Sequence, residues 1–307
     1  MPAADHPLPH RHAEAWPPQP GEIRFAPAKA LWLHLHLWPV VILGPSRIDP
    51  AAMAIGAALC ALCLCLGHSV GLHRALIHQS LQLGPRTQGV LLSLAALTGV
   101  GPVLRLMDVH DQRDHWQNQP ACPAYYAYQH GIFQDLWWNL HCAHHPPGGQ
   151  PQAPLRTADH YRSDGLLRAL DKWGWALNLL AGLALLAAGG PELWIWAHCG
   201  RITASILGHW LVNFAAHRHG ALDWTIEGAG EEGRNNLLFG ALSMGEGWHN
   251  NHHAFPHSAR FGQAWWQLDP GWWAVCALRA TGCAWGVRED TGAQPRPGGR
   301  RRLAAAR

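Results

Sequence analysis

Three histidines lie within five residues, at His249, His252 and His253, directly after a hydrophobic run. On a helix they stand at positions i, i+3 and i+4, so the three imidazoles project from one face and can converge on a metal ion. Imidazole is the commonest metal ligand among protein side chains. The spacing therefore predicts a metal site, and the fold must bring further ligands to this segment.

The residues around these histidines resemble a known family. The stretch 245–256 reads Gly-Glu-Gly-Trp-His-Asn-Asn-His-His-Ala-Phe-Pro, and a tryptophan-rich segment follows at 265–273. This pattern resembles the third histidine box of the membrane fatty acid desaturases of the acyl-CoA desaturase type. The resemblance implies an oxidoreductase that holds two non-haem iron ions and uses O2 as a co-substrate.

The composition favours a membrane protein. Hydrophobic residues make up 48% of the 307 residues and charged residues only 14%. The mean hydropathy of −0.10 is slightly negative, which fits spanning helices diluted by long segments rich in histidine and arginine. A formal net charge of +3 without a basic stripe argues against nucleic acid as a partner.

Four apolar segments predict two helical hairpins. The first pair runs over about 30–44 and 51–66 and is joined by the polar turn Pro-Ser-Arg-Ile-Asp-Pro. The second pair runs over 173–188 and 193–212 and is joined by Gly-Gly-Pro-Glu. A helix needs about 20 apolar residues to cross a bilayer, so each hairpin, with its flanking residues, can cross the membrane twice.

The apolar run at 90–104 has a different interpretation, because it contains Gly99, Gly101 and Pro102. As a span it would place the histidine motifs on opposite sides of the membrane, which a shared metal site forbids. We therefore expect an interfacial or partly re-entrant helix on the cytoplasmic side.

Charge decides the orientation of the four spans. The two turns contain a single basic residue, Arg47, whereas the arginines of the central segment and of the tails lie on the opposite side. By the positive-inside rule, that opposite side is cytoplasmic. The sequence thus predicts an all-α integral membrane protein with four transmembrane helices in two hairpins and a cytoplasmic helical metal-binding cap.

The same orientation places both termini in the cytoplasm and, in a bacterial host, the protein in the inner membrane. Residues 28–290 are expected to form one membrane desaturase-like domain. It lies between a disordered tail at 1–27, rich in Pro, His and Ala, and a basic disordered tail at 291–307.

Two further motifs supply histidines. His73-Arg-Ala-Leu-Ile-His78 resembles the first histidine box of the family, a His followed by Arg and a second His five positions on. On an ideal α-helix these two histidines stand about 140° apart, so they are expected to clasp a site between helices. Asn213 and His217 resemble the family element Asn-Ser-x-x-His, which implies that His217 is a metal ligand and that Asn213 reaches metal through water.

The second box departs from the family pattern His-Arg-x-His-His. His110 matches its first histidine, whereas Arg113 and Asp114 occupy the places of the other two. Asp114 is a candidate ligand, since it lies four residues after His110 on the same helical face and carboxylates are competent iron ligands. His115 is the competing candidate. In a third interpretation, Asp114 and Arg113 form a surface ion pair or anchor an acyl-carrier phosphate.

The predicted function follows from this ligand set. The expected iron ligands are His73, His78, His110, Asp114, His217, His249, His252 and His253. The resemblance implies an enzyme that introduces a double bond into a fatty acyl chain, carried as acyl-CoA or acyl-lipid, in contact with membrane lipids. An external electron donor of the ferredoxin or b-type cytochrome class is required, because the chain contains no haem or flavin motif.

The altered second box keeps two alternatives open. Relatives on the same fold perform hydroxylation or decarboxylation of fatty acyl chains, and such a shift of reaction fits a changed ligand set. The other alternative is a non-catalytic membrane protein that binds lipid or a metal.

Overall fold

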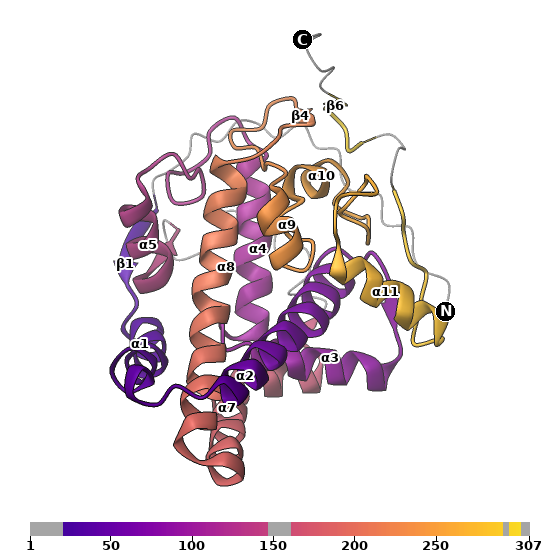
Figure 1. Ribbon diagram of the computed structural model, residues 1–307. Helices are drawn as coiled ribbons and strands as arrows, with labels where there is room; N and C mark the ends of the chain where they lie inside the picture. The colour runs from indigo at the N-terminus through magenta and orange to yellow at the C-terminus, as the bar shows by residue number, and fades with distance from the viewer. Residues whose placement is uncertain (1–20, 147–160, 291–294, 302–307) are drawn as a thin grey trace.

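The computed structural model describes residues 21–146, 161–290 and 295–301, and these form a mostly helical fold (Figure 1). Helices along the first half are α1 (Pro27–Ile42), the 3-10 turn η1 (Gly44–Ser46), α2 (Pro50–Leu62), the π-helix η2 (Cys63–Ile77), α3 (Pro85–Leu97), α4 (Val103–Gln117) and α5 (Ile132–His141). Helices along the second half are α7 (Gly165–Leu193), the π-helix η4 (Trp194–Gly200), α8 (Arg201–Arg218), α9 (Leu237–Leu242), α10 (His249–Ala254) and α11 (Pro270–Ala280).

Within the described residues, three short antiparallel strand pairs tie distant parts of the chain together. They are β1 (Glu22–Phe25) with β3 (Cys142–His145), β2 (Gln82–Leu83) with β5 (Ala284–Trp285), and β4 (Trp224–Ile226) with β6 (Gly299–Arg301). Strands β1 and β6 fall in the segments predicted as disordered tails. They are ordered because each finds a partner strand whose backbone groups it satisfies. Residues 1–20, 291–294 and 302–307 of those tails lie outside the described residues.

In the part of the chain that the structure describes, two stretches are long and apolar enough to cross a membrane, Pro50–Ile77 and Gly165–Arg218. The second has 54 residues, far more than the roughly 20 that one crossing needs. Its backbone leaves the helical conformation at Gly189 and Gly190, where φ is −153° and +68°, and α7 then packs against η4. The chain therefore folds back at the turn predicted from the sequence. Four spans remain a prediction, because α1 has only 16 residues.

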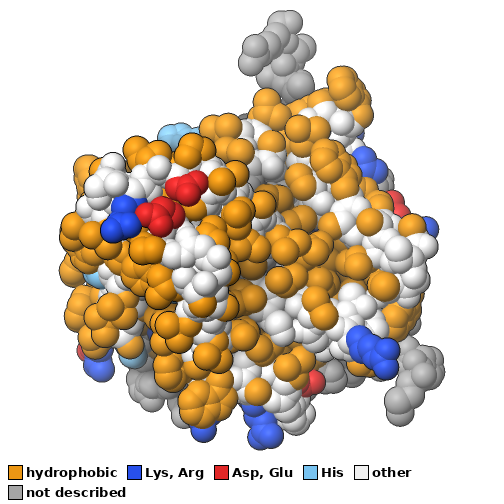
Figure 2. Space-filling model, turned by 60° about the horizontal axis from the view of Figure 1, so that its bottom comes forward, with side chains coloured by type: hydrophobic (Ala, Val, Ile, Leu, Met, Phe, Trp, Pro, Cys, Tyr) orange, Lys and Arg blue, Asp and Glu red, His pale blue; other side chains and the backbone are white. Residues whose placement is uncertain are grey.

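The outer surface of these helices is apolar. Figure 2 views the end of the molecule at the bottom of Figure 1, and hydrophobic side chains cover most of it. Exposed aliphatic side chains on α1, α2 and α7 include Leu31, Leu35, Ile42, Met53, Ile55, Leu180 and Leu183. A surface of this kind is unfavourable in water and favourable in lipid, so the molecule is associated with a membrane.

A buried arginine connects the end of α3 to the rest of the bundle. The Arg201 side chain donates hydrogen bonds to the carbonyl of Leu97 and, at 3.2 Å, to Oδ1 of Asn178. Asn178 Nδ2 in turn donates to the carbonyl of Ala96 at 2.8 Å. Carbonyls at the end of a helix lack intrahelical partners, and a cation there also complements the helix dipole. These contacts allow α3 to end inside the protein, ahead of an irregular connection to α4.

Replacing Arg201 by Leu is expected to destabilise the fold, because the carbonyl of Leu97 and the side chain of Asn178 lose a buried partner. Each such loss costs about 1–3 kcal/mol. Thermal unfolding in detergent should show a lower midpoint for Arg201→Leu. Arg47→Gln is the control, since Arg47 forms an exposed ion pair with Glu192 at 2.8 Å. An equal effect of the two substitutions would contradict this role of Arg201.

Candidate metal centre

The π-helix η2 brings His73 and His78 together. In a π-helix the backbone bonds run between residues five apart, and the amide of His78 donates to the carbonyl of His73 at 3.0 Å. Residues five apart therefore lie one above the other, and the Nε2 atoms of the two histidines are 3.0 Å apart. The α-helical estimate of about 140° between them was wrong for this reason.

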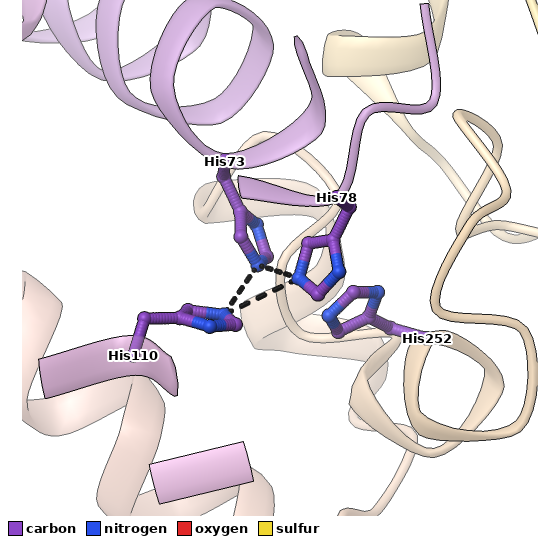
Figure 3. A group of neighbouring side chains, drawn as sticks. All are labelled: His73, His78, His110 and His252. Carbon is purple, nitrogen blue, oxygen red and sulfur yellow. Dashed lines mark hydrogen bonds between the residues drawn. The ribbon is translucent and has the colours of Figure 1, made fainter. Parts of the chain in front are cut away.

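Four imidazoles converge in the first group of ligands (Figure 3). His73 Nε2 lies 3.0 Å from Nε2 of His110 on α4, and His78 Nε2 lies 3.3 Å from the same atom. His252 on α10 completes the group, with its ring centroid 4.4 Å from that of His78. The first and second histidine motifs thus meet one histidine of the third.

Three imidazoles form a second group, His217, His249 and His253. His249 Nε2 lies 3.0 Å from Nε2 of His217 on α8 and 3.0 Å from Nε2 of His253. The third histidine motif is therefore divided between the two groups: His249 and His253, four residues apart, face one group, and His252 faces the other. This arrangement differs from convergence of all three on one metal ion.

Two asparagines hold α10 in the orientation that divides its histidines. The side-chain oxygen of Asn250 accepts hydrogen bonds from the amides of Asp223 and Trp224 at 2.8 and 2.7 Å. Asn251 donates to the carbonyl of Phe261 at 2.9 Å and to Gln267 at 3.0 Å. Both asparagines are buried, so these bonds fix the rotation of the short helix.

In each group, a glutamate side chain lies beside the Nδ1 atom of one histidine, on the side of the ring that points away from the other histidines. Glu246 Oε2 lies 2.6 Å from Nδ1 of His73, and Glu231 Oε1 lies 3.4 Å from Nδ1 of His217. A carboxylate in this place favours the proton on Nδ1 and directs the lone pair of Nε2 into the group. Several lone pairs at about 3 Å repel one another unless a cation lies among them. The donor set therefore fits a metal ion in each group.

The protonation of the third motif supports the same conclusion. Burial lowers the pKa of His249 to about 4 and lowers the pKa values of His252 and His253 well below their ordinary value. These imidazoles are neutral at pH 7, which is the form that binds metal. Burial raises the pKa of Glu231 to about 8, so ionisation of this carboxyl requires positive charge nearby.

A second arginine positions Glu246. The guanidinium of Arg74 is fully buried and lies 3.3 Å from Glu246 Oε1 and 2.8 Å from Asp269 Oδ1. Ser69 Oγ also donates to Glu246 Oε1 at 2.5 Å. The sequence-based prediction included neither Glu246 nor Arg74 among the site residues, although both lie inside the motifs that carry the histidines.

The altered second box lies beside both groups. Asp114 Oδ2 is 3.8 Å from Nδ1 of His110, and the Arg113 guanidinium donates to Oδ1 of Asn213 at 3.1 Å. The ring of His115 packs edge-on against Trp116, 5.1 Å between centroids. Within the described residues, the converging ligand atoms of the two groups come from histidines, and neither Asp114 nor His115 is among them.

A cavity of about 350 Å³ reaches the centre. His73, His110, His249 and His253 line it, together with Asp114. Apolar side chains from η2, α4, α8 and α9 form much of its remaining wall, among them Leu64, Leu72, Leu106, Val109, Leu211 and Leu242. Leu211 and Leu242 are also exposed on the apolar exterior. The wall of the cavity thus shares residues with the apolar exterior.

Two groups of buried and half-buried imidazoles beside a largely apolar cavity, in a membrane-associated helical fold, are the arrangement expected of a histidine-rich metal-binding membrane protein. A model of the family described as fatty acid desaturase matches residues 49–284. The chain therefore belongs to the fatty acid desaturase family, as the sequence predicted, and it is an oxidoreductase of lipid metabolism.

Individual relatives differ in their substrates. The chain is 30% identical over 260 residues to an sn-1 stearoyl-lipid 9-desaturase of Anabaena variabilis, covering 84% of this chain and 91% of that protein. It is 31% identical over 278 residues to a chloroplastic palmitoyl-monogalactosyldiacylglycerol delta-7 desaturase of Arabidopsis thaliana, covering 87% and 70%. An acyl-CoA C20 Delta5-desaturase of Anemone leveillei is 28% identical over 257 residues, covering 80% and 77%.

Substitution of Glu246 by Gln is expected to weaken metal binding about 10–100-fold, because His73 loses the carboxylate that orients its ring. Competition with a chelator of known affinity measures this change on purified protein. Glu227→Gln is the matched control, since Glu227 is exposed, pairs with Arg300 and belongs to neither histidine group. Unchanged affinity in Glu246→Gln would show that Glu246 does not support the ligand.

Proposed function

We propose that the protein introduces a double bond into a fatty acyl chain at a centre of two iron ions. His73, His78, His110 and His252 would hold one iron, and His217, His249 and His253 the other. The observation that carries this proposal is the convergence of two groups of buried and half-buried imidazoles beside one largely apolar cavity. Nitrogen and oxygen ligands with open positions are typical of iron sites that use O2.

The iron ions would supply, with O2, the oxidising power needed to remove hydrogen from an unactivated methylene. One double bond formed consumes one O2, two electrons and two protons and releases two water molecules. The chain's own residues do the remaining work. Glu246 and Glu231 lie beside Nδ1 of His73 and His217 and would orient these rings, and the apolar wall of the cavity would orient the chain and exclude water.

The substrate would be a fatty acyl chain bound to a lipid or to CoA, since relatives of both kinds are similar to this chain. An external donor of the ferredoxin or b-type cytochrome class would deliver the electrons. We further propose that four helices span the inner membrane of a bacterial host and that the metal centre and both termini face the cytoplasm, as the distribution of basic residues predicts.

Membranes that contain the protein, supplied with an acyl substrate, a reductant and O2, are expected to yield a mono-unsaturated product. His249→Ala should reduce the iron content from about two ions to about one or none and abolish product. His145→Ala is the control, because His145 is exposed and lies outside both groups. Gas chromatography with mass spectrometry and iron analysis measure both effects.

Either of two experimental outcomes would contradict this proposal and favour another function. Consistent recovery of a hydroxy acid or a terminal alkene would assign hydroxylation or decarboxylation to the same centre. Absence of iron from an intact, purified protein would favour the non-catalytic alternative.

We also propose that Asp114 completes the group of His217, His249 and His253. Asp114 lines the cavity beside His249 and His253, and this group has three imidazoles where the other has four. Its carboxylate also lies near Nδ1 of His110, so its two oxygens allow two roles, as iron ligand or as support for His110.

Asp114→Ala is expected to remove about one iron per chain, whereas Asp114→His should retain both, because imidazole can replace the carboxylate as a ligand. Iron analysis and Mössbauer spectra of the variants measure occupancy and ligand type. Asp108→Ala is the control, since Asp108 lies on the same helix and pairs with Arg162 at 3.0 Å. Full iron content and turnover in Asp114→Ala would place Asp114 outside the ligand set.

A further inference from the structure

Helix α5 exposes apolar side chains and buries polar ones. Its two titratable residues, Asp135 and His141, are buried, with exposed fractions of 0% and 9%. Phe133 and Trp137 stand four residues apart on one face and are 84% and 50% exposed. A surface helix of a soluble protein shows the opposite arrangement, with its apolar face toward the core. The outer face of α5 is therefore expected to meet a medium other than water.

Polar contacts on the inner side hold α5 in this rotation. Nε2 of His130 lies 2.6 Å from Asp135 Oδ2, and Nε1 of Trp210 on α8 donates to Asp135 Oδ1 at 2.7 Å. A buried carboxylate that lost these partners would be costly, so the helix is kept from turning its apolar face inward. The exposure of Phe133 and Trp137 is thus a consequence of how Asp135 is bound.

A series of stacked rings connects the outer face of α5 with α1. The ring of Phe25 on β1 stacks against Trp137 with centroids 6.1 Å apart, and Trp137 stacks against His141 at 4.6 Å. His141 Nε2 lies 3.1 Å from Nε2 of His34 on α1, whose ring stacks against Trp38 at 5.8 Å. Phe25 and Trp38 are 56% and 50% exposed. One aromatic surface therefore joins α5 and β1 to the apolar exterior of α1, above which they lie in Figure 1.

The residues on this surface match the boundary between lipid and water. Tryptophan is enriched at membrane interfaces, where its ring lies at the level of the head groups. An amphipathic helix in that layer buries its apolar face at the boundary between head groups and acyl chains. Since the surface is continuous with an exterior that already favours lipid, the partner it fits is the same membrane.

We propose that α5 lies in the interfacial layer of the membrane and inserts Phe133 and Trp137 among the lipid head groups. This placement requires the membrane association of the molecule and is independent of the reaction at the metal centre. Trp210, which binds Asp135, lies on α8 about two turns before His217. Contact of α5 with lipid thus sets the position of the histidine groups relative to the head groups.

Photo-crosslinking of the full-length protein in vesicles of phosphatidylethanolamine and phosphatidylglycerol tests this placement. Phe133 is replaced by p-benzoylphenylalanine, whose ketone inserts into neighbouring C–H bonds on irradiation. Because Phe133 is largely exposed, the larger aromatic side chain leaves the core undisturbed. Intact-mass spectrometry should show a fraction of the irradiated protein that has gained the mass of one lipid molecule.

Two positions serve as matched controls for the same replacement. Leu180 on α7 is 64% exposed on the apolar exterior and should give the same gain in mass. Glu227, exposed just after β4, should give none, since β4 lies at the end of the molecule opposite α7 in Figure 1.

Two results would overturn the proposal. One is a lipid adduct at position 180 without a lipid adduct at position 133, which would show that α5 does not touch the membrane. The other is an adduct at position 133 with the mass of a second copy of the chain. That result would assign the aromatic surface to contact between protein molecules instead of lipid.

Discussion

The arrangement of the two histidine groups depends on one buried cation, Arg74. Its guanidinium is fully excluded from solvent and contacts Glu246, Asp269 and the carbonyl of Ala259, while its carbon Cζ lies 3.9 Å from the centre of the Phe261 ring. These groups come from segments far apart in sequence, so Arg74 joins the π-helix η2 to the third histidine motif. Removal of either partner of such a buried pair leaves an uncompensated charge. The position of Glu246, and through it the ring of His73, follows from this network.

Arg74, Arg113 and Arg201 lie in three different environments. Arg74 is neutralised by two carboxylates, and Arg201 is satisfied by the carbonyl of Leu97 and the side chain of Asn178. Arg113 has a neutral amide and an aromatic ring beside it and opens onto the cavity. The first two stabilise the fold around the centre.

Helical winding decides which histidines meet. Residues five apart diverge on an α-helix but align on a π-helix, and η2 has π winding over the whole segment that precedes His78. The short helix α10 is held in place by Asn250 and Asn251. Its neighbouring residues His252 and His253 therefore point into different groups. Both features depend on backbone geometry that histidine spacing alone does not specify.

The sequence by itself determined the family, the apolar segments, the turn at Gly189-Gly190 and the histidines that converge, because residue type and spacing encode hydrophobic burial and ligand chemistry directly. Only the tertiary structure decided how those histidines divide into two groups. It also decided that Glu246 lies beside Nδ1 of His73 and that Glu231 lies beside Nδ1 of His217. It also ordered strands β1 and β6, which lie in segments that composition alone assigned to tails. These features require partners that are distant in the chain, and the local sequence does not predict which distant segments pair.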